Sequence, residues 1–359
     1  MARYAPMRKP REGYLKSQYG RRGQTFAALD LGTNNCRLLV ARPTQNGFHV
    51  IDSFSKPVRL GEGLESGNEL NQRAIERTLY ALEICAKKMR RHGVSRFRSV
   101  ATEACRRAKN AQKFLDDALE RTGITIEVIN RREEARLAVS GCRSLLNGPE
   151  PFAVVFDIGG GSTQVAWLSL DSQKDLLHGT ISVPFGVVTL CEKYGSGSLH
   201  PKLYQQIIDE VGEKLAAFCA CHKIAERCVA GQVQMIGTSG TVTTLAGIEK
   251  RLVYYDRKQV DGSTLTFAAI RKLCNDLCRM DISTRAKVPC IGKNRADLVI
   301  VGCAVLEAMC RRWPVGKLRV ADRGIREGIL RELMAEADRE GHCGPLDKAG
   351  NKLRGIYGV

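Results

Sequence analysis

Three features are missing from this chain of 359 residues, and each absence excludes a class of protein. No apolar stretch approaches the ~20 residues that a membrane-spanning helix requires, so we expect no membrane association. The first residues lack the apolar core of a secretory signal, so we expect no export. The P-loop pattern G-x-x-x-x-G-K-[ST] does not occur, which argues against that class of nucleotide hydrolase.

Acidic residues are scarce relative to basic ones. The 38 Asp and Glu stand against 56 Lys and Arg, which gives a formal net charge of +18. Residues 1–24 contribute +6 and residues 341–359 contribute +2, so the body carries +10. A body this basic favours a polyanionic partner such as nucleic acid, polyphosphate or nucleotides, although the excess charge alternatively only aids solubility. Residues 1–23 show no periodicity and are predicted to form a flexible basic arm.

Cysteine is abundant, with 14 residues, but no spacing among them indicates a disulfide framework. The cysteines are scattered through predicted helices and strands. Free thiols in this number suit a reducing compartment, so we expect a cytoplasmic protein.

The most informative feature that is present is a pattern that occurs twice. An apolar run ends in Asp30, a short polar turn follows and a second apolar run resumes; the same pattern returns around Asp157. Each copy predicts strand, tight turn and strand. Small residues in such a turn leave backbone N–H groups free to form a nest for an anion, although plain hairpin turns are the alternative. Two facing copies would bind phosphates through Gly32, Thr33, Asn34 and Asn35 and through Gly159, Gly160, Gly161, Ser162 and Thr163.

The surrounding elements repeat as well. Each turn belongs to a group of three predicted strands, which is followed by alternating helices and strands. The alternating elements include a strand at 124–129, a helix at 132–146 and a helix near 294–312. This order predicts an α/β protein of two duplicated domains, at 24–132 and 133–340, with a tail at 341–359.

A third glycine-rich segment follows a predicted strand at 232–237 and opens a helix. The free amides and partial positive charge of a helix N-terminus favour an anion there. A structural cap would explain Thr241 alone, but not the paired glycines. The candidate phosphate-binding residues of this segment are Gly237, Ser239, Gly240 and Thr241, with Thr238 between them.

Five motifs occur in the order found in a known family. They are Asp-Leu-Gly-Thr-Asn, Glu-Glu-Ala-Arg, Asp-Ile-Gly-Gly-Gly-Ser-Thr, Gly-Thr-Ser-Gly-Thr and Arg-Glu-Gly, at 30–34, 133–136, 157–163, 237–241 and 326–328. The set resembles the Ppx/GppA family of exopolyphosphatases and guanosine pentaphosphate phosphohydrolases. The resemblance implies two duplicated actin-like domains (ASKHA, ribonuclease H-like) with a cleft between them. It also implies release of a terminal phosphate from inorganic polyphosphate or pppGpp with a divalent metal ion, Mg²⁺ or Mn²⁺.

The chain departs from that family in two respects. The second loop of the family usually continues Ser-Thr-Glu, whereas this chain has Gln164. A neutral amide cannot neutralise a metal ion or accept a proton as a carboxylate can. Long members also carry a C-terminal extension with His-Asp metal-dependent-hydrolase character, whereas this chain resembles the short form.

Three acidic residues are candidates for the chemistry. Hydrolysis of a phosphoanhydride needs a water molecule in line with the terminal phosphorus and an acceptor for its proton. Glu134 is our candidate general base, since it lies in the first turn of a predicted helix between the two loops and the resemblance aligns it with the family's catalytic glutamate. The alternative is that such a glutamate only offsets the helix dipole, and this is the role we assign to Glu133. Asp30 and Asp157 are candidate metal ligands, because Mg²⁺ prefers few carboxylates with water and phosphate oxygens. Turn stabilisation is the alternative for both.

Arginine side chains would supply the point charges that an anionic chain needs besides amides. Arg106 and Arg326 are the candidates, with Arg37 and Arg107 considered beside them. A solvated surface role is the alternative for each.

The sequence therefore predicts a metal-dependent exopolyphosphatase that releases orthophosphate from the end of inorganic polyphosphate. Hydrolysis of pppGpp at its 5′ end is the nearest alternative. Gln164 and the basic arm leave a third reading open, a protein that binds ppGpp, pppGpp or RNA without turnover. A homodimer is also left open.

Overall fold

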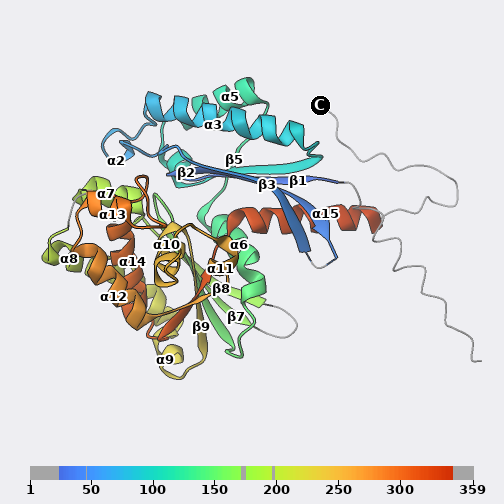
Figure 1. Cartoon of the computed structure of the whole chain (residues 1–359). Coiled ribbons are helices and arrows are strands. Elements are labelled where there is room, and N and C mark those ends of the chain that lie inside the picture. The colour runs from blue at the N-terminus through green and yellow to red at the C-terminus, as the bar shows by residue number, and fades with distance from the viewer. Residues whose placement is uncertain (1–23, 46, 171–174, 196–198, 343–359) are drawn as a thin grey trace, which may run out of the picture.

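Two mixed β-sheets with helices packed on their faces make up the protein (Figure 1). The computed structural model describes residues 24–45, 47–170, 175–195 and 199–342. The predicted arm at 1–23 and the tail from residue 343 onward lie outside the described residues. Within them, no helix is both long enough and apolar enough to span a membrane.

The first sheet has the strand order β3-β2-β1-β4-β5. Strand β2 is antiparallel to β1 and β3, whereas β4 is parallel to β1 and β5 is parallel to β4. The apolar sequence of β1 suits its central position, because both of its faces are covered. The strands are β1 (Phe26–Leu31), β2 (Asn35–Thr44), β3 (Gly47–Pro57), β4 (Arg96–Ala101) and β5 (Glu127–Val128).

One face of the first sheet is covered by a long amphipathic helix. The Asn71 side chain accepts a hydrogen bond from the Arg73 N–H and caps this helix, α3. Ile75, Leu79 and Leu82 form the stripe that packs on the sheet. The helices of this part are α2 (Leu64–Gly67), α3 (Gln72–Arg91), α4 (Glu103–Arg107) and α5 (Ala111–Thr122).

The second sheet repeats the first and adds one strand. Its order is β10-β11-β9-β6-β7-β8. Strands β8, β7, β6, β9 and β11 correspond in turn to β3, β2, β1, β4 and β5 of the first sheet, and β10 is the extra edge strand. The predicted duplication is thereby confirmed. The strands are β6 (Phe152–Ile158), β7 (Thr163–Leu170), β8 (Asp175–Val183), β9 (Val233–Thr238), β10 (Thr264–Thr266) and β11 (Lys317–Ala321).

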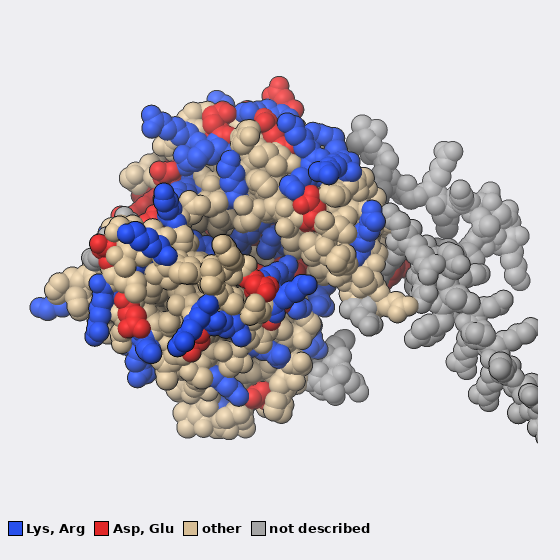
Figure 2. Space-filling model, viewed as in Figure 1, with Lys and Arg blue, Asp and Glu red and all other residues tan. Residues whose placement is uncertain are grey.

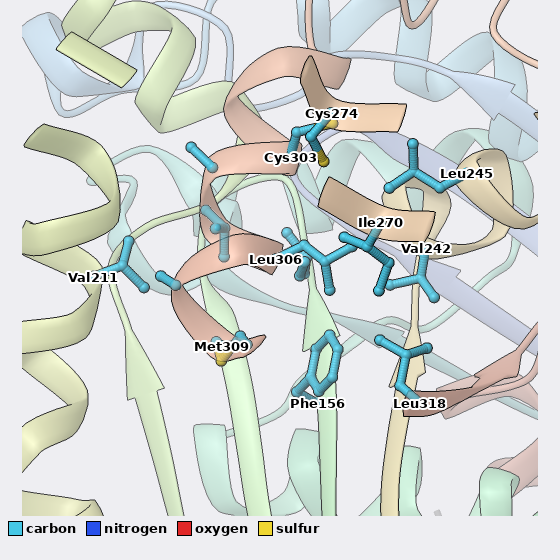
Figure 3. Packing of buried hydrophobic residues seen from close by; sticks show 14 of the residues in the cluster. Phe156, Val211, Val242, Leu245, Ile270, Cys274, Cys303, Leu306, Met309 and Leu318 are labelled. Atoms are coloured by element: carbon cyan, nitrogen blue, oxygen red, sulfur yellow. The ribbon is translucent and has the colours of Figure 1, made fainter. Parts of the chain in front are cut away.

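The core of the second part lies between this sheet and a helix that is buried almost all round, α14. Figure 3 shows Leu306 of this helix close to Phe156 of β6, with Val242 and Leu318 beside them. Burial of so much apolar surface is the main stabilising contribution to this half. The helices are α7 (Val187–Tyr194), α8 (Pro201–Cys221), α9 (Ile224–Val229), α10 (Gly240–Glu249), α11 (Arg257–Val260), α12 (Phe267–Cys278), α13 (Ile282–Lys287) and α14 (Val299–Arg312).

Two helices, α6 (Arg131–Cys142) and α15 (Ile325–His342), lie between the sheets (Figure 1). Ile329 and Leu330 of α15 pack with Phe26 of the first sheet, although α15 follows the second sheet in sequence. The domain limits inferred from the sequence remain a prediction, and α15 joins the two parts across them. The helices touch where their backbones approach: a Cβ on Gly141 would overlap the Gly324 carbonyl, and one on Gly328 would overlap the Leu137 carbonyl.

Most predicted elements are present, with shifted ends. The strand expected at 124–129 is reduced to the two residues of β5, and the helix expected from 294 begins only at Val299. The helix expected over 132–146 ends at Cys142 and continues as a 3₁₀ turn, Arg143–Leu145. Short elements such as α4, α7 and α13 were not predicted, because helices this short carry little periodicity.

The contact between α6 and α15 generates a stability prediction. Gly141→Ala should lower the free energy of unfolding by about 1–3 kcal/mol, because the added methyl group collides with backbone that cannot move aside cheaply. Chemical denaturation measures this change. Gly212→Ala is the matched control, since Gly212 also lies within a helix but its Cβ would meet only the Arg312 guanidinium at 3.6 Å. A smaller loss at Gly141 than at Gly212 would contradict the packing argument.

Candidate active site

The two predicted phosphate loops face each other in the structure. Loop 1 (residues 32–34) joins β1 to β2, and loop 2 (residues 159–162) joins β6 to β7. A Cβ on Gly160 would lie 3.0 Å from the Asn34 N and 3.1 Å from the Thr33 Cβ, and one on Gly161 would lie 2.6 Å from the Thr33 Oγ1. The loops are therefore in contact, and the glycines of loop 2 are needed because there is no room for side chains.

The third segment joins the same site from the N-terminus of α10. Ser239 is the N-cap residue, in an unusual conformation with φ of 102°, and its buried Oγ has no hydrogen-bond partner among the described residues. Strain of this kind, with an unsatisfied hydroxyl at a helix N-terminus, is typical of a site that binds an anion.

These segments enclose a cleft of about 110 Å³ between the two sheets. Figure 2 shows basic side chains in the hollow between the two lobes. Most of the candidate residues meet there. They are Asp30, Gly32, Thr33, Asn34, Asn35, Arg37, Glu134, Asp157, Gly159, Gly160, Gly161, Ser162, Ser239, Gly240 and Thr241.

Among the candidate phosphate-binding residues, Thr163, Gly237, Arg106 and Arg326 do not line the cleft, and the two arginines are described below. The Thr163 hydroxyl donates to the Phe185 carbonyl at 2.6 Å, so it holds the protein's own backbone. Gly237 lies against the Phe156 ring, which a Cβ there would contact at 2.6 Å. Gln164, where the chain departs from the family, donates from its side-chain amide to the Ser162 Oγ at 3.2 Å. Its position thus supports loop 2.

Glu134 lies in the first turn of α6 with its carboxyl buried in the cleft. Burial raises the pKa of Glu134 to about 7, and the negative charges of Asp157 and Asp30 raise it further. Arg106 opposes this shift, because its Nη2 lies 2.7 Å from the Glu134 Oε2. A carboxyl with a pKa near neutrality can take up and release a proton at cellular pH. Neighbouring Glu133 instead pairs with Arg136 and Arg98 outside the cleft.

Arg106 is shared between two carboxylates, which the sequence did not reveal. Its Nη2 also lies 2.8 Å from Glu103 Oε2, and its Nη1 donates to the Ile129 carbonyl. Burial acts to raise the pKa of Glu103, but Arg106 and Arg131 hold it below its ordinary value. Glu103 is almost fully buried and lines the cleft. Arg107, the next residue, faces elsewhere and pairs with Glu65.

Asp30 and Asp157 face the cleft without an ion-pair partner among the described residues. Burial raises the pKa of Asp157 to about 6 and raises the pKa of Asp30 as well; Asp30 adds to the shift at Asp157 and Arg37 opposes both. The described residues contain no group of three or more His, Cys, Asp and Glu side chains placed to hold a metal ion. Two desolvated carboxylates beside phosphate loops nevertheless suit a cation that takes its other ligands from water and phosphate.

A second cavity of about 370 Å³ adjoins the cleft, and Asp30 and Asp157 line both. Arg37, Arg295 and Arg326 line this chamber, and none of the three has a carboxylate partner within ion-pair distance among the described residues. Burial lowers the pKa of Arg326 and of Arg295, and Arg37 lowers both further. Arg295 was missed by the sequence analysis, because nothing in the sequence marks it before α14 is packed. Neighbouring guanidinium groups that are not held in ion pairs are typical of an anion site, although Asp30, Asp157 and Asp322 line the same chamber.

Two sheets of one topology that turn glycine-rich loops toward a common cleft define a phosphate-binding protein of the actin-like class. The model of the Ppx/GppA phosphatase family matches residues 39–337. The chain belongs to this family, as its motifs indicated. Its two duplicated, actin-like domains agree with the solved structures of the family.

Individual relatives are distant. The chain is 27% identical over 334 residues to guanosine-5′-triphosphate,3′-diphosphate pyrophosphatase of Aeromonas salmonicida, a match that covers 92% of this chain but 63% of that protein. A Ppx/GppA family member of Aquifex aeolicus is 27% identical, with a TM-score of 0.71 over 88% of this chain and 98% of that one. An exopolyphosphatase of Cytophaga hutchinsonii, 21% identical, shares the fold with a TM-score of 0.78 over 87% of this chain and 98% of its own.

The sharing of Arg106 generates a pH prediction. In Glu103→Gln, Glu134 is the only carboxylate left to pair with Arg106, so the positive charge of Arg106 should lower the pKa of Glu134. If activity needs the Glu134 carboxylate, activity rises with pH through about 7 in the native protein. In the variant this rising limb should move to lower pH, by roughly half a pH unit or more. The pH dependence of phosphate release measures this shift. A rising limb that moves to higher pH in the variant would contradict the idea that Glu103 and Glu134 share Arg106.

Proposed function

We propose that this chain hydrolyses the terminal phosphoanhydride bond of inorganic polyphosphate and releases orthophosphate. The observation that carries the proposal is Glu134, a buried carboxyl with a pKa near 7 in the same cleft as the amides of both phosphate loops. Phosphoryl transfer requires positioning and charge stabilisation more than covalent chemistry by the protein. The site offers amides for positioning and one base for a water molecule.

In this proposal the terminal phosphate lies in the cleft that loop 1 and loop 2 both line, and N–H groups of the loops donate to its oxygens. The N-terminus of α10 faces the same space and favours negative charge. Water adds to the terminal phosphorus, and the bond from that phosphorus to the bridging oxygen breaks. Glu134 accepts the proton of the water, and the shortened chain departs with the bridging oxygen.

Asp30 and Asp157 would hold a divalent ion, Mg²⁺ or Mn²⁺. They fit this role because each is half-buried and faces the cleft without an ion-pair partner among the described residues, and because burial and the nearby charge of Asp30 raise the pKa of Asp157. When bound, such an ion would polarise phosphate oxygens and offset the negative charge of the leaving chain. The Asn34 Oδ1, buried and without a hydrogen-bond partner in the described part of the chain, is a further acceptor beside them.

Hydrolysis of pppGpp to ppGpp is the second candidate function. The relative from Aeromonas salmonicida is named for that chemistry, and the arginine-lined chamber beside the cleft is roomy enough for more than an unbranched phosphate chain. A nucleotide with a second diphosphate would bring additional negative charge to Arg295 and Arg326.

The assignment of the base predicts the effect of one substitution. Glu134→Gln should lower turnover of polyphosphate about 10²–10⁴-fold, because the amide cannot accept the proton of water, while binding of the substrate persists. Steady-state phosphate release and a separate binding titration measure the two effects. Glu133→Gln is the matched control, since its carboxyl precedes Glu134 on α6 but pairs outside the cleft. Near-native turnover in a folded Glu134→Gln protein would remove Glu134 as the base.

The choice of substrate is tested by comparing pppGpp with inorganic tripolyphosphate and long-chain polyphosphate, at equal magnesium. The proposed activity predicts the highest kcat/KM on the long inorganic chain.

The substitution Arg326→Gln separates the two candidate functions. If the second diphosphate of pppGpp occupies the chamber, this change should lower kcat/KM for pppGpp about tenfold, the loss of one charge-assisted contact, more than it does for tripolyphosphate. Equal losses on both would place Arg326 at the shared triphosphate or outside the site.

A further inference from the structure

The backbone of loop 1 is held from outside by the segment that follows β3. The N–H groups of Val58 and Arg59 both donate to the Asn34 carbonyl, at 2.8 and 2.9 Å, and the Gly61 N–H donates to the Thr33 carbonyl at 3.0 Å. The segment needs Gly61, because a Cβ there would overlap the Thr33 side chain. Any displacement of residues 58–61 therefore displaces loop 1.

Loop 2 is held in the corresponding way by the N-terminus of α7. The N–H groups of Val187 and Val188 donate to the carbonyls of Gly159 and Gly160, at 3.0 and 2.8 Å. Gly186 packs directly on the loop, since a Cβ on it would overlap the Gly160 carbonyl. The orientation of loop 2 therefore depends on α7, and the orientation of loop 1 depends on residues 58–61.

These two supports are joined to each other across the cleft. The Gly63 N–H donates to the Glu192 Oε1 of α7 at 2.8 Å. The Arg59 Nη2 lies 2.9 Å from the Asp297 Oδ2, two residues after Arg295 of the chamber. Both contacts link the first half of the chain to the second.

We propose that residues 58–63, α7 and Asp297 form an interdomain latch that sets the separation of the two phosphate loops. Arg59, Asp297 and Glu192 are its positioning residues. The loops already touch at Gly160 and Asn34, so a small shift of either half changes which amides can reach one phosphate. Misplacement by about 1 Å is enough to cost catalysis substantially.

The exposure of the latch fits a contact that opens and closes. The side chains of Arg59 and Asp297 are 40% and 20% exposed, so water can replace their contact at small cost. The other end of the segment is anchored within its own half: Arg77 donates to the Val58 carbonyl at 3.1 Å and pairs with Glu62 at 2.5 Å. The segment therefore moves with the first sheet, and its contacts with Glu192 and Asp297 are the ones that break on opening.

Charge reversal tests the latch. Arg59→Asp should speed hydrogen exchange at the Val58, Arg59 and Gly61 amides and lower kcat/KM about tenfold, with the loss mostly in kcat if loop alignment is what suffers. Asp297→Arg should act alike, and the double variant should recover most of the loss, because the pair is restored with reversed charges. Arg121→Ala is the control, since Arg121 joins α5 to α3 away from the cleft through Glu83 and Glu76.

The expected change in kcat/KM rests on the proposed hydrolysis, whereas the expected change in hydrogen exchange does not. If no phosphate substrate is turned over but exchange rises in Arg59→Asp, the latch stands and the proposed function fails. Unchanged exchange and unchanged kcat/KM in Arg59→Asp would overturn the latch. So would a double variant no better than the single ones. If Asp297→Arg does not fold, Glu192→Ala with Arg59→Ala removes both contacts and should raise exchange in both loop supports.

Discussion

The structure depends on the direct contact of the two loops that connect β1 to β2 and β6 to β7, the central hairpins of the two sheets. Gly160 and Gly161 leave no space between loop 2 and the Thr33–Asn34 backbone. This contact brings Asp30 and Asp157 into one desolvated space, where neither has a cationic partner among the described residues. Burying two carboxylates in this way is unfavourable unless a bound group offsets their charge. The cleft is therefore arranged for a ligand at the expense of stability.

Acidic and basic side chains share the wall between the cleft and the chamber. Asp30, Asp157, Arg37 and Arg295 line both spaces, whereas Glu134 lines only the cleft and Arg326 only the chamber. Burial raises the pKa of each of the three carboxyls. A phosphate chain in the cleft would meet the loop amides and Glu134, with the guanidinium groups of Arg37 and Arg295 beside them. Such an arrangement allows one site to act at the terminus of a polyanion while nearby cations offset its charge.

The helices between the sheets connect this chemistry to the fold. α6 carries Glu134 in its first turn, and α15 carries Arg326, and the two helices cross through Gly141 and Gly328. The base and a chamber cation are thus placed by one helix pair. Because α15 packs on the first sheet while following the second in sequence, it joins both halves of the protein.

The sequence by itself determined the duplicated α/β architecture and both loops, because strand, tight turn and strand are local patterns written into consecutive residues. It also marked Asp30, Asp157 and Glu134 as candidates, each beside a recognisable motif, and all three line the cleft. Only the tertiary structure decided the roles of the arginines: Arg106 reaches two carboxylates whereas adjacent Arg107 pairs with Glu65. The contacts of Glu103 with Arg131, of Arg295 with Thr244 and of Arg59 with Asp297 were likewise invisible, since each partner comes from a distant segment. Local periodicity fixes which element a residue joins, but long-range packing fixes what its side chain meets.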